Sequence, residues 1–302
     1  GHAIIGTGAQ PTVNGIVGND WWNRETGKTV YCVDDQASKV VGASPQSRKT
    51  PMSPVNLQAT TVGHELELAT GGAARTVSIS LKDRAAILMA GHRADAVLWF
   101  DEGAGNWVSS SYYFPDGRLP AWVEEVNREK IPDTYRALTW TPNVDAAALR
   151  RVWNPQGKNL NFSHNLMGSN YSAFTVSPYG TAFVLETAKR AVKAERLGQD
   201  DIPDILTLNF ASNDFVGHRY GPDSPEVLDI SVQTDRQLSD FLNFLDKNVT
   251  GGLKNVTFAI SADHGVVNQP EIMADCGLPV ARAVSAEIRK AADSALDAQV
   301  GP

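Results

Sequence analysis

The sequence predicts an α/β fold built around a largely parallel sheet. Short apolar runs that suit buried strands alternate with longer amphipathic segments that suit helices. Several helical segments begin at Ser-Pro pairs and end at glycines, which are common helix boundaries. A chain of 302 residues can bury a large core. We expect one α/β domain over residues 1–302, with an insertion of weak periodicity at about 116–170 that shapes the rim of a pocket.

The first half of the chain predicts one helix and three strands. Ser53-Pro54 predicts the start of a helix that ends near Gly71-Gly72, and a strand follows over residues 75–80. Two further strands, over residues 96–100 and 107–114, are joined through a glycine-containing turn. These two strands are predicted to form an antiparallel hairpin.

The last third of the chain predicts a strand–helix–strand unit. A helix from Ser177-Pro178 to about Gly198 precedes an apolar strand over residues 205–211. A second helix, over residues 224–252, leads to another apolar strand over residues 256–262. Such a crossover makes the two strands parallel and brings the loops that follow them to one edge of the sheet. Ligands of open α/β sheets bind at that carboxyl edge.

Each of these two strands is followed by an aspartate and a histidine. Asp214 and His218 are four residues apart, so they share one face if the chain turns helical there. Asp263 and His264 are adjacent and would bind together only from a bent loop. Carboxylate and imidazole suit zinc or a similar divalent ion, and two ions about 3.5–4 Å apart can clamp both ends of a phosphoryl displacement. The pairs predict a phosphate-ester hydrolase, although an aspartate after a strand is also a common helix cap.

A basic pair follows the strand at residues 75–80. Lys82 and Arg84 are two residues apart, so an extended backbone would point both to the same side while Asp83 points away. A lysine point charge and an arginine fork complement the oxygens of a phosphate monoester. Solvated surface charge remains an alternative interpretation of this pair.

The glycine-rich opening of the chain carries a weaker signal. Asn19 could donate an amide hydrogen bond, and His2 could be a structural histidine. Together with the segments 80–88, 212–222 and 261–265, this opening resembles the alkaline phosphatase superfamily. The resemblance is to its type I phosphodiesterase/nucleotide pyrophosphatase branch, and within it to the periplasmic alkaline phosphatases.

The resemblance implies an alkaline phosphatase-like three-layer α/β/α sandwich that binds two zinc ions and acts on phosphate monoesters. A threonine held by one ion would attack phosphorus and form a phosphothreonine intermediate. Asp263 and His264 match ligands of the ion that activates this threonine, and Asp214 and His218 match ligands of the other ion. The resemblance leaves calcium and manganese open as the metal.

The resemblance also assigns the groups that bind the phosphate. Asn19 matches the amide that holds a non-bridging phosphate oxygen. Lys82 and Arg84 match the basic pair that marks the monoesterases of this branch. A periplasmic or secreted location is implied in the same way.

The sequence departs from the family pattern at both ends. The nucleophilic threonine of the pattern lies a few residues ahead of the Gly1-His2 step, and a further histidine ligand lies downstream of His264, after which this chain has no histidine. Two protein ligands per ion are also fewer than the three that catalytic zinc usually has. We therefore expect an incomplete portion of a longer enzyme.

The net charge of the chain limits the kinds of molecule that it is expected to bind. The chain has 27 Lys and Arg against 34 Asp and Glu, a formal charge of -7, which argues against nucleic acid or a membrane as a stable partner. We expect a monomer that acts on small-molecule phosphate esters. Two alternatives remain: a nucleotide pyrophosphatase or phosphodiesterase of the same superfamily, and a metal-binding module without catalysis.

Overall fold

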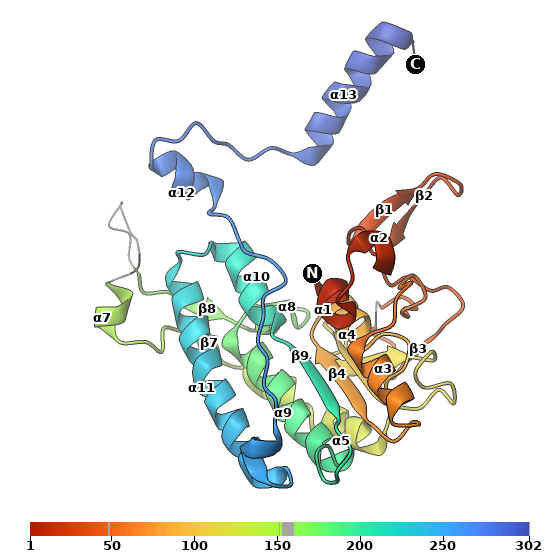
Figure 1. The fold of residues 1–302 in the computed structure, drawn as a ribbon. Coiled ribbons are helices and arrows are strands. Elements are labelled where there is room, and N and C mark those ends of the chain that lie inside the picture. Colours follow the sequence, from red (N-terminus) through yellow and green to blue (C-terminus); the bar gives the residue numbers. More distant parts are fainter. Residues whose placement is uncertain (48, 151, 153–159, 302) are drawn as a thin grey trace.

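The computed structural model describes residues 1–47, 49–150, 152 and 160–301, and its centre is a five-stranded sheet with helices on both faces (Figure 1). The strand order is β3-β6-β5-β4-β9. β4 pairs in parallel with both β5 and β9, whereas β6 pairs antiparallel with β5 and with β3. The sheet is therefore mixed, and the prediction of a largely parallel sheet is corrected in this respect. The five strands are β3 (Val40–Val41), β4 (Thr76–Ser80), β5 (Ala96–Asp101), β6 (Asn106–Ser110) and β9 (Ile205–Asn209).

Alternate residues of the sheet face two helical layers. Val97 and Trp99 of β5 pack with residues of α4, while Leu98 and Phe100 pack with residues of α9. This is the period of two that a strand buried on both faces requires. The structure thus has the α/β/α layering that the resemblance implies. The longer helices are α3 (Val62–Ala69), α4 (Asp83–Ala90), α5 (Ala121–Glu129), α9 (Pro178–Ala194), α10 (Ala211–Tyr220), α11 (Pro225–Asn248) and α13 (Ser285–Val300).

Shorter elements decorate this frame. β1 and β2 form an antiparallel hairpin near the N-terminus, and β7 and β8 form a second small ribbon. Residues of α12 and α13 extend away from the sheet and are largely exposed (Figure 1). The shorter elements are α1 (His2–Thr7), α2 (Pro11–Asn14), β1 (Asp20–Asn23), β2 (Lys28–Tyr31), α6 (Ile131–Arg136), β7 (Thr139–Trp140), α7 (Ala146–Leu149), β8 (His164–Asn165), α8 (Ser172–Thr175), a 3₁₀ turn (Gly252–Asn255) and α12 (Pro270–Asp275).

The helix boundaries in the last third follow from local chemistry. The Ser224 hydroxyl accepts a hydrogen bond from the Val227 N–H at 3.2 Å and caps α11, whose first residue is Pro225. α9 likewise begins at Pro178, and Gly198 follows it with a left-handed φ of 67°. Both predicted helices are confirmed. None of the described helices is both long and apolar enough to cross a membrane.

The predicted strand over residues 256–262 is wrong. Among the described residues this segment has no strand pairing, and Phe258 and Ile260 are 50% and 70% exposed. An apolar run becomes a strand only when a neighbour accepts and donates its backbone hydrogen bonds, and here β9 is bonded on one side alone, to β4. The segment still runs toward the carboxyl edge of the sheet, because Val256 packs on the core and Val266 reaches Gly217 of α10.

The helix predicted from Ser53-Pro54 begins later than expected. Residues 54–60 form turns, and the Thr61 hydroxyl accepts from the His64 N–H at 3.3 Å to cap α3. The predicted hairpin of residues 96–100 and 107–114 is confirmed, although β6 ends at Ser110. Within the weakly periodic region at about 116–170, α5 and α6 lie against α9. Residues 151 and 153–159 of that region fall outside the described residues.

An aromatic cluster between the sheet and α9 forms the largest part of the core. The Trp107 ring stacks on Phe183 with a centroid separation of 4.9 Å, and Phe100 meets both rings edge-on. The Trp107 indole N–H donates to the Thr187 hydroxyl at 2.9 Å, so its polar atom is satisfied within the buried layer. These rings fix α9 against β5 and β6.

Replacing Trp107, which is 0% exposed, by alanine should lower the free energy of unfolding by about 3–5 kcal/mol, because a large cavity would remain and the hydrogen bond to Thr187 would be lost. Urea denaturation measures this loss. The matched control is Trp22→Ala, since Trp22 is 63% exposed and its removal should cost less than about 0.5 kcal/mol. Equal losses in the two variants would contradict this description of the core.

Candidate active site

The candidate site lies where β4 and β9 end. These strands pair in parallel in the register Ser80↔Asn209, so both chains leave the sheet at the same edge. The Ser80 hydroxyl donates to the Asn209 side-chain carbonyl at 2.9 Å and accepts from the Lys82 N–H at 2.9 Å. The segment after β4 and the helix after β9 are therefore fixed side by side.

Helix α10 carries the first acid–histidine pair. Asp214 and His218 lie one turn apart on it, with the Asp214 Oδ1 3.2 Å from His218 Nε2. The helix is anchored at its start, because the Ser212 hydroxyl donates to the Thr175 carbonyl at 2.7 Å and the Asn213 side chain accepts from Thr234 at 2.9 Å. The condition under which Asp214 and His218 share one face, that the chain turns helical there, is met by α10.

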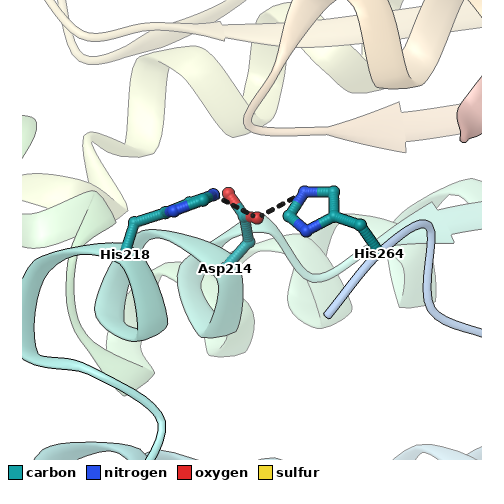
Figure 2. A group of neighbouring side chains, drawn as sticks. All are labelled: Asp214, His218 and His264. Carbon is teal, nitrogen blue, oxygen red and sulfur yellow. Dashed lines mark ion pairs between the residues drawn. The ribbon is translucent and has the colours of Figure 1, made fainter. Parts of the chain in front are cut away.

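His264 approaches Asp214 from the opposite side. Its Nε2 lies 3.1 Å from Asp214 Oδ1, and Figure 2 shows the carboxylate between the two imidazoles. The histidine comes from the extended segment that follows residues 256–262, not from a helix. Two segments 50 residues apart in sequence, as counted from Asp214 to His264, thus supply one cluster.

The three side chains have the spacing that a divalent ion needs. Their ligand atoms all lie within 4.8 Å of one another, while a tetrahedral zinc with bonds of about 2.0–2.2 Å separates its ligands by about 3.3–3.6 Å. Asp214 Oδ1 is buried and has no hydrogen bond from any described residue, despite the nearby imidazoles. A buried carboxylate oxygen between two imidazole nitrogens suits a cation better than it suits any donor present.

The charge of Asp214 is maintained by its neighbours. Burial alone would raise the pKa of this carboxyl, but the Lys82 ammonium, which hydrogen-bonds to it, and the two histidines lower the pKa below its usual value. The aspartate is therefore ionised at neutral pH, as a metal ligand must be.

Asp263 sits at the edge of this cluster, in contact with His2. Its Oδ2 lies 3.8 Å from His264 Nε2 and 3.4 Å from His2 Nδ1. The Asn209 amide faces His2 Nε2 at 3.2 Å, so a neutral His2 that accepts there carries its proton on Nδ1, toward Asp263. His2 thereby links the end of β9 to the Asp263 carboxylate.

His2 reaches this position through α1. A Cβ atom on Gly6 would lie 2.7 Å from the Leu88 carbonyl, so only glycine allows α1 to approach α4 this closely. Gly1 lies directly against Asp263. The first residues of the chain therefore border the acid–histidine cluster.

Lys82 and Arg84 do not lie as residues of an extended strand, which corrects the prediction made from alternation. Lys82 precedes α4 and Arg84 lies in its first turn. The Lys82 ammonium pairs with Asp214 and sits 4.6 Å from the centre of the Phe215 ring, whereas the Arg84 guanidinium donates to the Tyr31 hydroxyl at 3.4 Å. Both positive charges lie close enough to His2 to lower its pKa.

Asn19 is exposed and lies just ahead of β1. Its backbone carbonyl accepts from the Cys32 N–H at 2.8 Å, and the next residue, Asp20, is paired with Tyr31. Asn19 therefore lies beside the tyrosine that contacts Arg84.

The structure places three residues at this site that the sequence patterns did not assign to it: His2, which was considered only as a structural histidine, and Tyr31 and Asn209. His2 and Asn209 are 207 residues apart, and Tyr31 meets Arg84 over 53 residues, so no local spacing marks either contact. One signal was present for Asn209, since a polar residue that ends a buried strand points into the loop region where ligands bind.

Comparison with known proteins places this chain in a family. Residues 1–277 match the family described as type I phosphodiesterase / nucleotide pyrophosphatase. The chain belongs to this type I phosphodiesterase family. It is 38% identical over 283 residues to the alkaline phosphatase PhoV of Synechococcus elongatus, covering 89% of this chain and 50% of that protein. It is also 38% identical over 286 residues to the alkaline phosphatase PafA of Elizabethkingia meningoseptica, covering 90% and 52%.

The fold agrees with this type I phosphodiesterase assignment. The crystal structure of wild-type PafA superposes with a TM-score of 0.90 at 34% identity, over 99% of this chain and 59% of that one. The chain spans about half the length of the curated relatives it matches. In this structure Asp214, His218 and His264 form a group of side chains that could hold a divalent metal ion.

Removing a cluster ligand should remove bound metal. We expect Asp214→Ala and His264→Ala each to lower the zinc content of the full-length protein, purified with zinc and then dialysed, by about one ion per chain, because each substitution removes one ligand of an ion. Elemental analysis measures the content. His164→Ala is the control, since His164 pairs with Glu226 at 2.9 Å outside the cluster and should leave the zinc content unchanged. The same content in all three variants would show that the cluster does not bind the ion.

The His2 imidazole should make the metal-free protein sensitive to mild acid. Burial, with the nearby charges of Lys82 and Arg84, outweighs Asp263 and lowers the pKa of His2 from 6.5 to about 4. As the pH falls, the unfolded chain therefore binds the proton before the folded one does. The contribution of His2 to the free energy of unfolding is complete above pH 6.5, and the free energy of unfolding falls by up to about 3 kcal/mol as the pH drops to 4. Urea titrations across this range should show a flatter pH dependence for His2→Gln. An unchanged slope in the variant would refute this role.

Proposed function

We propose that the protein hydrolyses phosphate monoesters as an alkaline phosphatase of the type I phosphodiesterase family. The observation that carries the proposal is the convergence of Asp214, His218, Asp263 and His264 at one edge of the sheet, with Lys82 among them. Two relatives that match about nine tenths of this chain, PhoV and PafA, are named alkaline phosphatases, which supports the same reaction class.

The four side chains would hold two zinc ions in the proposed reaction. Asp214 and His218 would ligate one ion, and Asp263 and His264 the other. Bound zinc would supply positive charge that stabilises the attacking and leaving oxygens of the phosphoryl group. The chain's own contribution is to keep Asp214 ionised through Lys82 and to orient Asp263 through its contact with His2.

The nucleophile in this proposal is a threonine that precedes Gly1 in the full-length protein. The position of Gly1 against Asp263 supports this idea, because residues ahead of Gly1 would enter the cluster. The threonine oxygen would attack phosphorus, the alcohol of the ester would leave, and water would then release phosphate from the phosphothreonine.

The phosphate oxygens would be bound by Asn19, Lys82 and Arg84. Arg84 offers a planar fork of N–H donors, Lys82 offers a point charge, and the Asn19 amide offers a neutral donor. A monoester carries one more non-bridging oxygen and up to one more negative charge than a diester. Two cations beside the metal site therefore favour a monoesterase over a nucleotide pyrophosphatase or phosphodiesterase.

Replacing Lys82 and Arg84 together by alanine in the full-length protein should separate these two activities. Two lost charge-assisted hydrogen bonds should lower kcat/KM for an aryl phosphate monoester by about 100-fold or more, and that for the matching diester by about tenfold or less. Initial rates on the two chromogenic esters measure both values.

The control for this pair is Lys189→Ala with Arg190→Ala, which removes two neighbouring basic side chains of α9 that pair with glutamates. It should leave both activities unchanged. Equal losses on the two esters in the Lys82 and Arg84 variant would contradict the monoesterase proposal. Bound zinc without turnover of either ester would favour a non-catalytic metal-binding module.

A further inference from the structure

A chain of hydrogen bonds holds Arg84 from behind. The Arg84 guanidinium donates to the Tyr31 hydroxyl at 3.4 Å, and that hydroxyl donates to Asp83 Oδ1 at 2.5 Å. The other oxygen of Asp83 accepts from the Lys49 ammonium at 3.2 Å. The four residues come from β2, from the first turn of α4 and from the loop that precedes Pro51. None of these four residues belongs to the metal cluster. Arg84 alone has a proposed role in the reaction, which is to bind the phosphate.

The protonation states along this chain are fixed by burial and charge. Burial would raise the pKa of Asp83, but Lys49, the Tyr31 hydroxyl and the Arg84 backbone N–H outweigh it and hold the pKa below its usual value. Burial and the Asp83 charge raise the pKa of Tyr31 well above 10. The phenol of Tyr31 therefore stays protonated and donates its O–H in the hydrogen bond to Asp83. Only a lone pair of its oxygen is left to accept from Arg84.

This arrangement leaves the positive charge of Arg84 free to interact with an incoming phosphate. Lys49 balances the buried Asp83 carboxylate, and Tyr31 stands between that carboxylate and the guanidinium. Over the part of the chain that the structure describes, Arg84 forms no ion pair within 4.0 Å. A direct pair with Asp83 would have neutralised the group and turned its fork away from an incoming phosphate.

The β1–β2 hairpin carries a second phosphate contact of the proposed function. Asn19 lies just ahead of β1, and the register of the hairpin puts its neighbour Asp20 opposite Tyr31. A shift of this hairpin would therefore move the Asn19 amide and the support of Arg84 together.

We propose that Tyr31, held by Asp83 and Lys49, is a positioning residue that aims the Arg84 guanidinium at the substrate phosphate. This inference rests on the proposed function, because Arg84 must bind phosphate for its aim to matter. Tyr31, Asp83 and Lys49 lie outside the metal cluster and would act on the reaction only through Arg84.

The test is a double-mutant cycle between Tyr31→Phe and Arg84→Ala in the full-length protein. Tyr31→Phe keeps the ring and removes only the hydroxyl. We expect it to lower kcat/KM for an aryl phosphate monoester by about tenfold, to weaken inhibition by inorganic phosphate by a similar factor, and to change diester turnover by less than about twofold. In the Arg84→Ala background the same substitution should cause no further loss.

Two further variants separate positioning from packing. Tyr113→Phe removes another buried phenol hydroxyl, one that donates to the Gly91 carbonyl at 2.9 Å at the far end of α4, and should leave monoester turnover unchanged. Lys49→Ala should reproduce the loss of Tyr31→Phe, while Lys49→Arg, which keeps the charge beside Asp83, should retain most of the activity.

Each outcome of the cycle is informative. A loss in Tyr31→Phe of equal size with and without Arg84, or no loss while Arg84→Ala is impaired, would overturn the positioning role and leave the proposed function standing. Full monoester turnover and unchanged phosphate inhibition in Arg84→Ala would instead overturn the phosphate-binding role of Arg84, and the positioning role with it.

Discussion

The parallel pairing of β4 with β9 is the constraint on which the site depends. Its register, with Ser80 opposite Asn209, ends both strands at the same level and joins them through their side chains. From there α4 and α10 leave the sheet together, which brings Lys82 to Asp214 over 132 residues of sequence. A slip of one residue would turn every side chain of β9 to the opposite face and separate these groups.

Charge is arranged around this edge in two regions with different partners. Carboxylates and imidazoles gather beside α10, where Asp214 is ionised but lacks a hydrogen-bond donor on one oxygen, as suits a cation. Arg84 stands beside the β1–β2 hairpin, where Tyr31 separates it from Asp83, as suits an anion. Lys82 lies between the two regions. A phosphate ester bound here would have the metal ions on one side of its oxygens and the Lys82 and Arg84 side chains on the other.

The sequence predicted those features that are set by local chemistry. The Ser-Pro starts and glycine ends located α9 and α11, and the apolar runs located β4 and β9. The run at residues 256–262 failed because a strand depends on a partner's backbone, which its own side chains do not reveal. Lys82 and Arg84 were found by residue type but placed on the wrong local geometry, since a helix begins between them. His2, Asn209 and Tyr31 depend on contacts across the fold and left no pattern of spacing.

The proposed function requires that Asp214, His218, Asp263 and His264 bind divalent cations at the carboxyl edge of the sheet. Anomalous diffraction at the zinc absorption edge, from crystals of the full-length protein grown with zinc, tests it most directly. We expect a peak about 2.0–2.2 Å from an oxygen of Asp214 and from His218 Nε2, and a second beside Asp263 and His264. Ordered density for these four side chains without an anomalous peak among them would show that they do not bind the ions.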